Sequence, residues 1–230
     1  MSKDNTIILV HGFWGGAAHW SKVIQALYQQ GYRNVRAIEL SLMSFSEDVN
    51  RLQKMVSQQE GEVLLVGHSY GGAVITEAGN LPNVAGLVYI AAFAPDKGES
   101  PGALTEQIPP EAFSSIAPDN DGYLWINYDK YHESFCQDLS EEDAWVMSVT
   151  QKAPLGATFA GTITTPAWRN KPSWYQISSK DRMIHPDNQK VMSARILPRK
   201  VITLDSGHAS LASQAEAVTK LIVEAVEATS

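Results

Sequence analysis

The chain has 230 residues, of which 44% are hydrophobic and 19% charged, an ordinary composition for one globular domain of generous size. The net charge of -7 disfavours nucleic acid as a partner, because an acidic surface repels phosphates. A single cysteine, Cys136, excludes an internal disulfide. No apolar stretch approaches the roughly 20 residues that span a bilayer, and the first apolar run is too short for a signal peptide. We therefore expect a soluble, cytoplasmic protein with no membrane partner.

Six apolar segments of strand length recur along the chain, each bounded by residues that favour turns. They cover residues 6–10, 35–40, 62–66, 86–91, 173–177 and 200–204. Several are continuously apolar, which is typical of strands that helices cover on both faces of a sheet.

Segments with helical periodicity lie between most of these strands. They cover residues 18–30, 46–59, 71–79, 186–194 and 214–228. Strand and helix therefore alternate, and this order predicts an α/β fold with a doubly wound, mainly parallel six-stranded sheet.

The alternation stops between residues 95 and 171. This stretch has no strong strand pattern, is rich in aromatic residues, and is too long for a structureless loop. We interpret residues 95–171 as a helical cap insertion over the carboxyl edge of the sheet. Residues 1–94 and 172–230 then form the core domain.

The strongest functional signal is the segment Gly67-His68-Ser69-Tyr70-Gly71-Gly72, which matches G-x-S-x-G. It directly follows a predicted strand and precedes a predicted helix, which is the context of a nucleophile elbow. The tight turn requires glycine where a side chain would clash with neighbouring backbone. The segment therefore predicts that Ser69 is a nucleophile at a helix N-terminus, where N–H groups stabilise negative charge.

A serine nucleophile needs a base, and folds with this elbow place the serine, the acid and the histidine in that chain order. Of the six histidines, only His208 comes just after the last predicted strand, where a loop can bring its imidazole over Ser69. Asp181 follows the fifth strand and is the predicted acid that orients the imidazole. Asp187 and Asp205 are the competing carboxylates.

The oxyanion hole of such a site needs two backbone N–H donors. We predict those of Tyr70, directly after the nucleophile, and Phe13, in the loop after the first strand. Further residues are expected to support the site by close packing or hydrogen bonding: Gly12, Gly67, His68 and Gly71. Aromatic residues suggest an apolar substrate pocket, with four candidates: Trp14, Trp125, Tyr128 and Trp145.

Motifs for metal ions and nucleotides are missing from the sequence. It contains no H-E-x-x-H, no cysteine pair and no glycine-rich phosphate loop of the Rossmann or Walker type. We therefore expect no metal and no other cofactor.

Three segments resemble the α/β-hydrolase family that contains the plant methylesterases and hydroxynitrile lyases. They are residues 8–16, 66–72 and 89–95, and the segments around Asp181 and His208 also fit that family. The resemblance implies a helical cap over an apolar pocket, cofactor-free ester hydrolysis and frequent homodimers.

Two positions separate the esterases of this family from its lyases. The lyases carry a threonine at the position of Gly12 and a lysine directly after the catalytic histidine, where this chain has Ala209. The prediction is therefore a serine carboxylesterase that acts on small to medium apolar esters through an acyl-serine intermediate. Two alternatives stay open: a lyase or carbon–carbon bond hydrolase on the same triad, and a small-molecule receptor with vestigial hydrolase activity.

Overall fold

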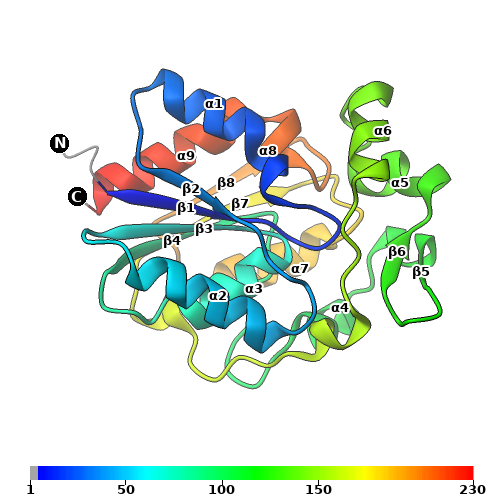
Figure 1. Ribbon diagram of the computed structural model, residues 1–230, viewed down its shortest axis with the longest axis horizontal. Helices are drawn as coiled ribbons and strands as arrows, with labels where there is room; N and C mark the ends of the chain where they lie inside the picture. Colours follow the sequence, from blue (N-terminus) through cyan, green and yellow to red (C-terminus); the bar gives the residue numbers. More distant parts are fainter. Residues whose placement is uncertain (1–4, 230) are drawn as a thin grey trace.

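The computed structural model describes residues 5–229 and contains a parallel sheet of six strands with helices on both faces (Figure 1). The strands are β1 Thr6–Val10, β2 Val35–Ile38, β3 Val63–His68, β4 Val84–Ile90, β7 Ser173–Ser178 and β8 Lys200–Leu204. Their order across the sheet is β2-β1-β3-β4-β7-β8, and every neighbouring pair is parallel. The predicted fold class is confirmed.

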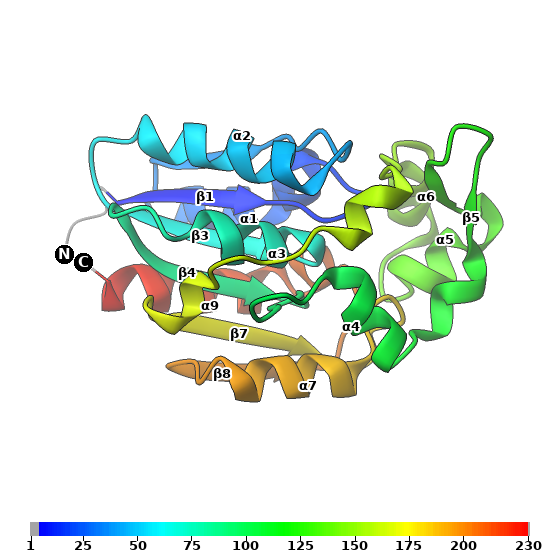
Figure 2. The same cartoon turned by 90° about the horizontal axis from the view of Figure 1, so that it is seen from below.

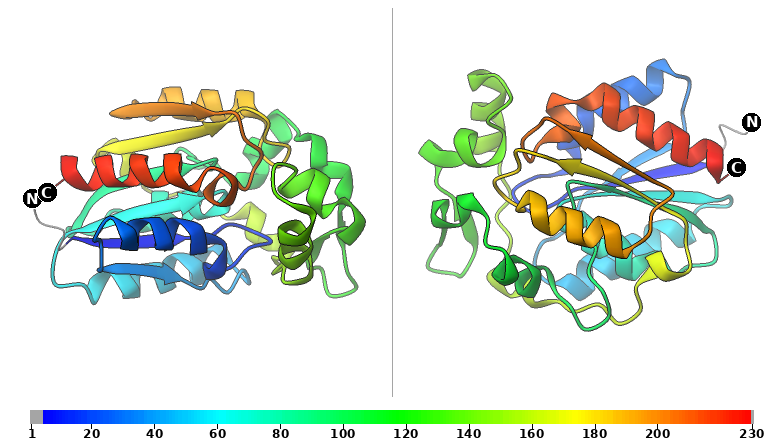
Figure 3. Two further views of the ribbon diagram at one scale, coloured as in Figure 1. Left: turned by 90° about the horizontal axis from the view of Figure 1, so that it is seen from above. Right: turned by 180° about the vertical axis from the view of Figure 1, so that it is seen from behind.

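Helices cover the sheet in two layers (Figures 1 and 3). One face carries α1 Ser21–Gln29 and α9 Ala215–Ala228, and the other carries α2 Phe45–Ser57, α3 Tyr70–Ala78 and α7 Pro186–Arg195. Short helices also lie near the sheet ends: η1 Ala17–Trp20 and α8 Ser210–Ser213.

Successive residues of β1 alternate between two hydrophobic cores. Ile7 and Leu9 pack in the core under α1 and α9, whereas Ile8 and Val10 pack in the core under α2 and α3. Because both faces are buried, every position of the strand is apolar or buried, which explains the absence of polar alternation in the sequence.

Between β4 and β7 the chain forms a group of short elements at the carboxyl end of the strands (Figure 2). They are α4 Pro101–Gln107, η2 Glu111–Ser115, β5 Ile116–Pro118, β6 Leu124–Ile126, α5 Tyr128–Phe135, α6 Glu141–Val149 and η3 Gly156–Ala160; the short helix η4 Ala167–Arg169 follows in the segment that returns to the start of β7. The insertion, predicted to be helical, also contains two short strands, since β5 and β6 form an antiparallel hairpin. Strands of three residues are too short to show an alternating pattern.

The last part of this segment, residues 161–171, leaves the carboxyl edge and runs back along α3 to the start of β7 (Figure 2). Asn80 at the end of α3 donates a hydrogen bond to the carbonyl of Thr165 at 2.6 Å, and Glu77 accepts one from the Thr164 N–H at 2.8 Å. These residues therefore pack on the sheet's helical layer and do not cover the strand ends.

The carboxyl ends of β1, β3, β7 and β8 lie at the edge of the sheet that faces the inserted elements (Figure 2). The loops that follow these strands contain Phe13, Ser69, Asp181 and His208, respectively. Ligand sites of open parallel sheets lie at this edge, so the fold brings the predicted chemistry to the expected side.

Candidate active site

Ser69 occupies the sharp turn between β3 and α3. Its backbone has φ 55° and ψ -125°, a conformation that L-residues other than glycine rarely adopt, and its carbonyl accepts hydrogen bonds from the N–H groups of Gly72 and Phe93. Strain of this kind is held in place by the surrounding structure and clusters at functional sites. The side chain is 3% exposed and lies in the wall of a pocket.

Glycine is required on both sides of this serine. A Cβ added at Gly67 would lie 2.6 Å from the carbonyl oxygen of Gly71, and one added at Gly71 would lie 2.4 Å from that of Val10. Both distances are far below van der Waals contact, so any larger residue would push α3 away from β1 and β3.

The side chains of His208 and Asp181 are buried and hydrogen-bonded to each other. The Nδ1–H of His208 donates to Oδ2 of Asp181 at 2.7 Å. The Nε2 of His208 is buried and has no hydrogen-bond partner among the described residues, Ser69 included. Catalytic hydrogen bonds are often long or misaligned in substrate-free sites. The arrangement leaves Nε2 of His208 unpaired among the described residues, in a position to accept a hydrogen bond or a proton.

The competing carboxylates do not take part in this contact. Asp187 pairs with Lys190 at 2.8 Å and Asp205 pairs with Lys180 at 2.9 Å, and both carboxylates are largely exposed. Asp181 is the member of the three that the structure brings to His208.

Two further buried histidines bind backbone segments of the site. His68 donates from Nε2 to the carbonyl of His208 at 2.8 Å, and burial lowers the pKa of His68 well below its ordinary value. His11 donates from Nδ1 to the carbonyl of Gly12 and accepts the N–H of Leu40 at Nε2, and burial lowers its pKa as well. Both imidazoles are therefore neutral hydrogen-bonding supports for the loops around Ser69.

The loop after β1 passes directly beside the nucleophile. A Cβ at Gly12 would lie 2.5 Å from the Cβ of Ser69 and 3.0 Å from its Oγ. The next residue, Phe13, stacks on Tyr70 with ring centroids 4.0 Å apart. Tyr70 is the first residue of α3, so its N–H has no acceptor within the helix. The rings of Phe13 and Tyr70, whose N–H groups are the predicted oxyanion donors, therefore pack against each other next to Ser69.

Trp14 fixes this loop to the inserted segment. Its φ of 57° lies in the left-handed region, and its N–H donates to the carbonyl of Lys152 at 3.0 Å. The indole Nε1–H donates to the carbonyl of Leu124 at 2.7 Å, and the Trp14 carbonyl accepts from the hydroxyl of Tyr131 at 3.1 Å. The position of Phe13 therefore depends on contacts with residues far along the chain.

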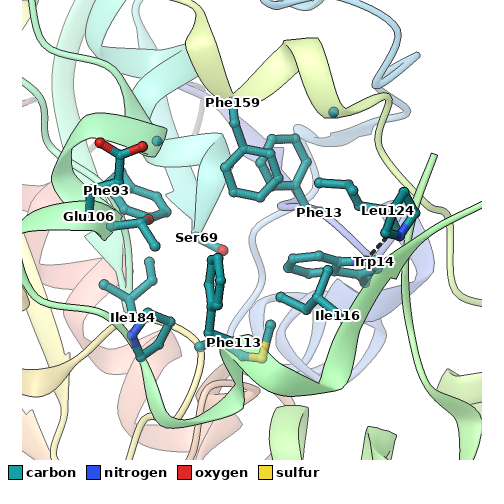
Figure 4. Close-up of a pocket in the computed structure, with 16 residues that line it drawn as sticks. Phe13, Trp14, Ser69, Phe93, Glu106, Phe113, Ile116, Leu124, Phe159 and Ile184 are labelled. Atoms are coloured by element: carbon teal, nitrogen blue, oxygen red, sulfur yellow. Dashed lines mark hydrogen bonds between the residues drawn. The ribbon is translucent and has the colours of Figure 1, made fainter. Parts of the chain in front are cut away.

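A pocket of about 350 Å³ contains Ser69 in its wall (Figure 4). This volume is near the lower end of the range for small-molecule sites, roughly 300 to 1,000 Å³. Among the described residues that line it, Ser69, Thr105 and Glu106 have hydroxyl or charged side chains. The others are mainly aromatic or aliphatic: Phe13, Trp14, Phe93, Phe113, Ile116, Leu124, Phe159, Met183 and Ile184.

Of the four aromatic residues predicted for the pocket, the structure brings only Trp14 to it. The indole of Trp125 donates to Asp119 within the β5–β6 hairpin, while Tyr128 and Trp145 are 49% and 62% exposed. Trp125, Tyr128 and Trp145 therefore do not line this pocket. Aromatic content alone does not tell which face of the inserted helices meets the core.

Comparison with known proteins identifies the group to which the chain is related. The model of the alpha/beta hydrolase family matches residues 7–221, from β1 into α9. The chain belongs to the alpha/beta hydrolase family. The matched range includes the Ser69 elbow of this family member and the loops that contain Asp181 and His208.

Relatives extend over nearly the whole length of this alpha/beta hydrolase. An alpha/beta hydrolase of Aspergillus novofumigatus is 27% identical over 94% of each chain, and methylesterase 3 of Arabidopsis thaliana is 24% identical over 96% of each. The fold matches a pyrethroid hydrolase from Sphingobium faniae with TM-score 0.83 at 23% identity, covering 97% of this chain and 98% of the other. It also matches polyneuridine aldehyde esterase with TM-score 0.82 at 20% identity, covering 96% and 98%. Together with the family match, the sequence relatives support a hydrolytic function of the esterase type.

The structure adds a residue of this site that sequence reasoning missed. Gln189 of α7 is fully buried and donates from Nε2 to Oδ2 of Asp181 at 2.8 Å, the same oxygen that binds His208. The Oδ1 of Asp181 accepts the N–H groups of Met183 and Ile184 at 2.7 and 2.9 Å. Both carboxylate oxygens of Asp181 therefore accept two hydrogen bonds each. The role of Gln189 is visible only in the structure, where α7 packs against β7.

Two structural observations bear on metal ions and membranes. Within residues 5–229, no group of three or more His, Cys, Asp or Glu side chains is arranged to hold a metal ion. In the same range, none of the helices combines the length and apolar character that crossing a bilayer requires.

Proposed function

We propose that this alpha/beta hydrolase is a serine carboxylesterase with Ser69 as nucleophile, His208 as base and Asp181 as acid. The observation that carries the proposal is the state of His208. One ring nitrogen binds the buried Asp181 and the other has no partner among the described residues, while the ring centroid lies 4.6 Å from that of His68, the neighbour of Ser69. A histidine held by a buried carboxylate, with its second ring nitrogen unpaired, supports the role of a base for a serine nucleophile.

The proposed reaction proceeds in two halves. As Ser69 Oγ attacks the ester carbonyl, His208 Nε2 takes the hydroxyl proton, and Asp181 stabilises the resulting imidazolium. The N–H groups of Phe13 and Tyr70 stabilise the oxyanion that forms. His208 then gives its proton to the departing alcohol, leaving an acyl-serine. Water attacks the acyl-serine as His208 takes its proton, and His208 then returns this proton to Ser69 Oγ as the carboxylic acid leaves.

The pocket favours small to medium, uncharged apolar esters. Aromatic and aliphatic side chains dominate its lining, and the charged member of that lining, Glu106, is negative (Figure 4). A substrate with its own carboxylate would lose hydration in this pocket and face repulsion from Glu106. The sequence relatives, an alpha/beta hydrolase and a methylesterase, support the proposal of ester hydrolysis.

The test is hydrolysis of nitrophenyl esters of increasing acyl length by wild type, Ser69→Ala and a control, Ser57→Ala. Ser57 lies exposed at the end of α2 and has no part in the site. We expect wild type and Ser57→Ala to turn over short and medium esters many times per protein, and Ser69→Ala to be inactive. Equal activity of Ser69→Ala and wild type would overturn the proposal.

Labelling with a fluorophosphonate separates the remaining alternatives. If Ser69 is labelled but no ester is turned over, the ester proposal fails and cyanohydrin cleavage becomes the next assay. If one ester molecule reacts per protein without further turnover, the receptor alternative is favoured. The threonine of the lyases would not fit at Gly12 of this structure, since its Cβ would lie 2.5 Å from that of Ser69.

A further inference from the structure

Tyr70 connects the nucleophile to a buried carboxylate outside the triad. Its backbone follows Ser69 directly, yet its fully buried side chain points to α2, where the hydroxyl donates to Oδ2 of Asp48 at 2.9 Å. The same ring stacks on Phe13 with an interplanar angle of 17°. One side chain therefore contacts both segments that contain the proposed oxyanion donors.

Asp48 is 0% exposed, and its charge is stabilised by hydrogen bonds. Its Oδ1 accepts the N–H groups of Ser41 and Leu42 at 2.8 and 3.1 Å and the Ser41 hydroxyl at 3.0 Å. Its Oδ2 accepts the Tyr70 hydroxyl. An isolated buried carboxylate is costly, so an anchor of this kind holds its donors strongly.

The phenol of Tyr70 remains a donor at every ordinary pH. Burial, together with the nearby charge of Asp48, raises the pKa of Tyr70 far above its usual value. The hydrogen bond to Asp48 therefore persists across the ordinary pH range and holds the hydroxyl end of the Tyr70 side chain in place.

The ring of Phe13 lies in the wall of the pocket, and Tyr70 stacks on it. On the side of the pocket it contacts Phe159, with centroids 4.4 Å apart, as the close-up shows (Figure 4). The following residue, Trp14, is hydrogen-bonded to the inserted segment. Phe13 thus has fixed neighbours on each side, and the Tyr70 ring is the one that links it to the elbow.

We propose that Asp48 and Tyr70 are positioning residues of the oxyanion hole: the Asp48 carboxylate holds the Tyr70 hydroxyl, and the Tyr70 ring sets the distance between the Phe13 loop and the Ser69 elbow. This inference rests on the proposed esterase function and adds two residues to it. Oxyanion donors must be held within about 0.5 Å of their productive position. In this proposal, release of the Tyr70 hydroxyl lets the side chain shift and disturbs that alignment.

The test is Tyr70→Phe, which removes the hydroxyl and keeps the ring. We expect kcat for a short nitrophenyl ester to fall about 10- to 100-fold with KM unchanged, less than the roughly 100- to 1000-fold loss of a whole donor. The affinity for a trifluoromethyl ketone, whose adduct places an oxyanion in the hole, should fall in parallel.

The matched control is Tyr89→Phe. Tyr89 is equally buried, its hydroxyl shares a hydrogen bond of 2.9 Å with Thr76, and its ring stacks on Tyr175 instead of Phe13. Both variants lose one buried hydrogen bond and should lose similar thermal stability, but Tyr89→Phe should keep the kcat of wild type. Equal kinetics of the two folded variants, or a change in KM alone, would overturn the inference while leaving the esterase proposal intact.

A double-variant cycle tests the role of Asp48. If Asp48 acts through the Tyr70 hydroxyl, Asp48→Asn combined with Tyr70→Phe should lower kcat no further than the more affected single variant. Losses that multiply would show that Asp48 acts independently and would overturn its assignment. If Tyr70→Phe does not fold, Asp48→Asn carries the same kinetic test, because it keeps the volume of the side chain. Absence of Ser69-dependent hydrolysis in wild type would instead refute the esterase proposal, and this inference with it.

Discussion

His19 makes the stability of the fold depend on pH. It lies in η1, is 8% exposed, and packs with its ring against Gly15 and Phe135. Burial lowers its pKa from 6.5 to about 4, with a smaller contribution from the nearby imidazoles of His11 and His208. The folded protein therefore keeps His19 neutral at pH values where the unfolded chain is already protonated.

The sign and size of the effect follow from proton linkage. The folded-state pKa is the lower of the two, so stability is complete above pH 6.5 and is lost as pH falls toward 4. Between about pH 7.5 and about pH 4.5, one such histidine removes about 2.5 kcal/mol from the free energy of unfolding. His11 and His68, whose pKa values burial also lowers, steepen the same loss.

The assay is urea unfolding of wild type and His19→Gln at both pH values, followed by tryptophan fluorescence. The cost of the substitution itself is measured at the higher pH and subtracted. We expect the acid-induced loss of stability to be about 2.5 kcal/mol smaller in His19→Gln than in wild type. An equal loss in the two proteins would show that His19 is not held neutral by the fold.

Three substitutions test other parts of the site. Gly12→Ala should reduce kcat at least about 100-fold, because the new Cβ would displace the Ser69 side chain 2.5 Å away; unchanged kcat would contradict the tight loop packing. Gln189→Leu removes one donor from Asp181 and should lower kcat about 10-fold at constant KM; a change in KM alone would argue against this role. Phe113→Ala opens the pocket at a residue that is 63% exposed. It should shift the acyl-length profile toward longer esters and change stability by less than about 0.5 kcal/mol; an unchanged profile would place Phe113 outside the acyl site.

The fold was predictable where local pattern and tertiary environment agree. The continuous apolar runs of β1 and β3 are buried on both faces, and this burial is what the sequence pattern reports. The hairpin of β5 and β6 was missed, because its strands have three residues each and one contains Pro118.

The residues of the candidate site were likewise predictable only where a local sequence pattern marks them. Ser69 was found because the elbow imposes a local pattern: the glycines beside it meet neighbouring backbone at less than 3 Å if a Cβ is added. Gln189, Asp48 and the role of the Tyr70 side chain have no local signature, since each acts on a residue in another element. The pocket residues were mostly missed for the same reason.

The most direct test of the proposed chemistry is the mass of the protein during turnover of a slowly deacylated ester. Intact-mass and peptide mass spectrometry after rapid acid quench should show one acyl group per protein, located on Ser69, and none in Ser69→Ala. Turnover without a covalent acyl group, or an acyl group on another residue, would contradict the acyl-serine mechanism.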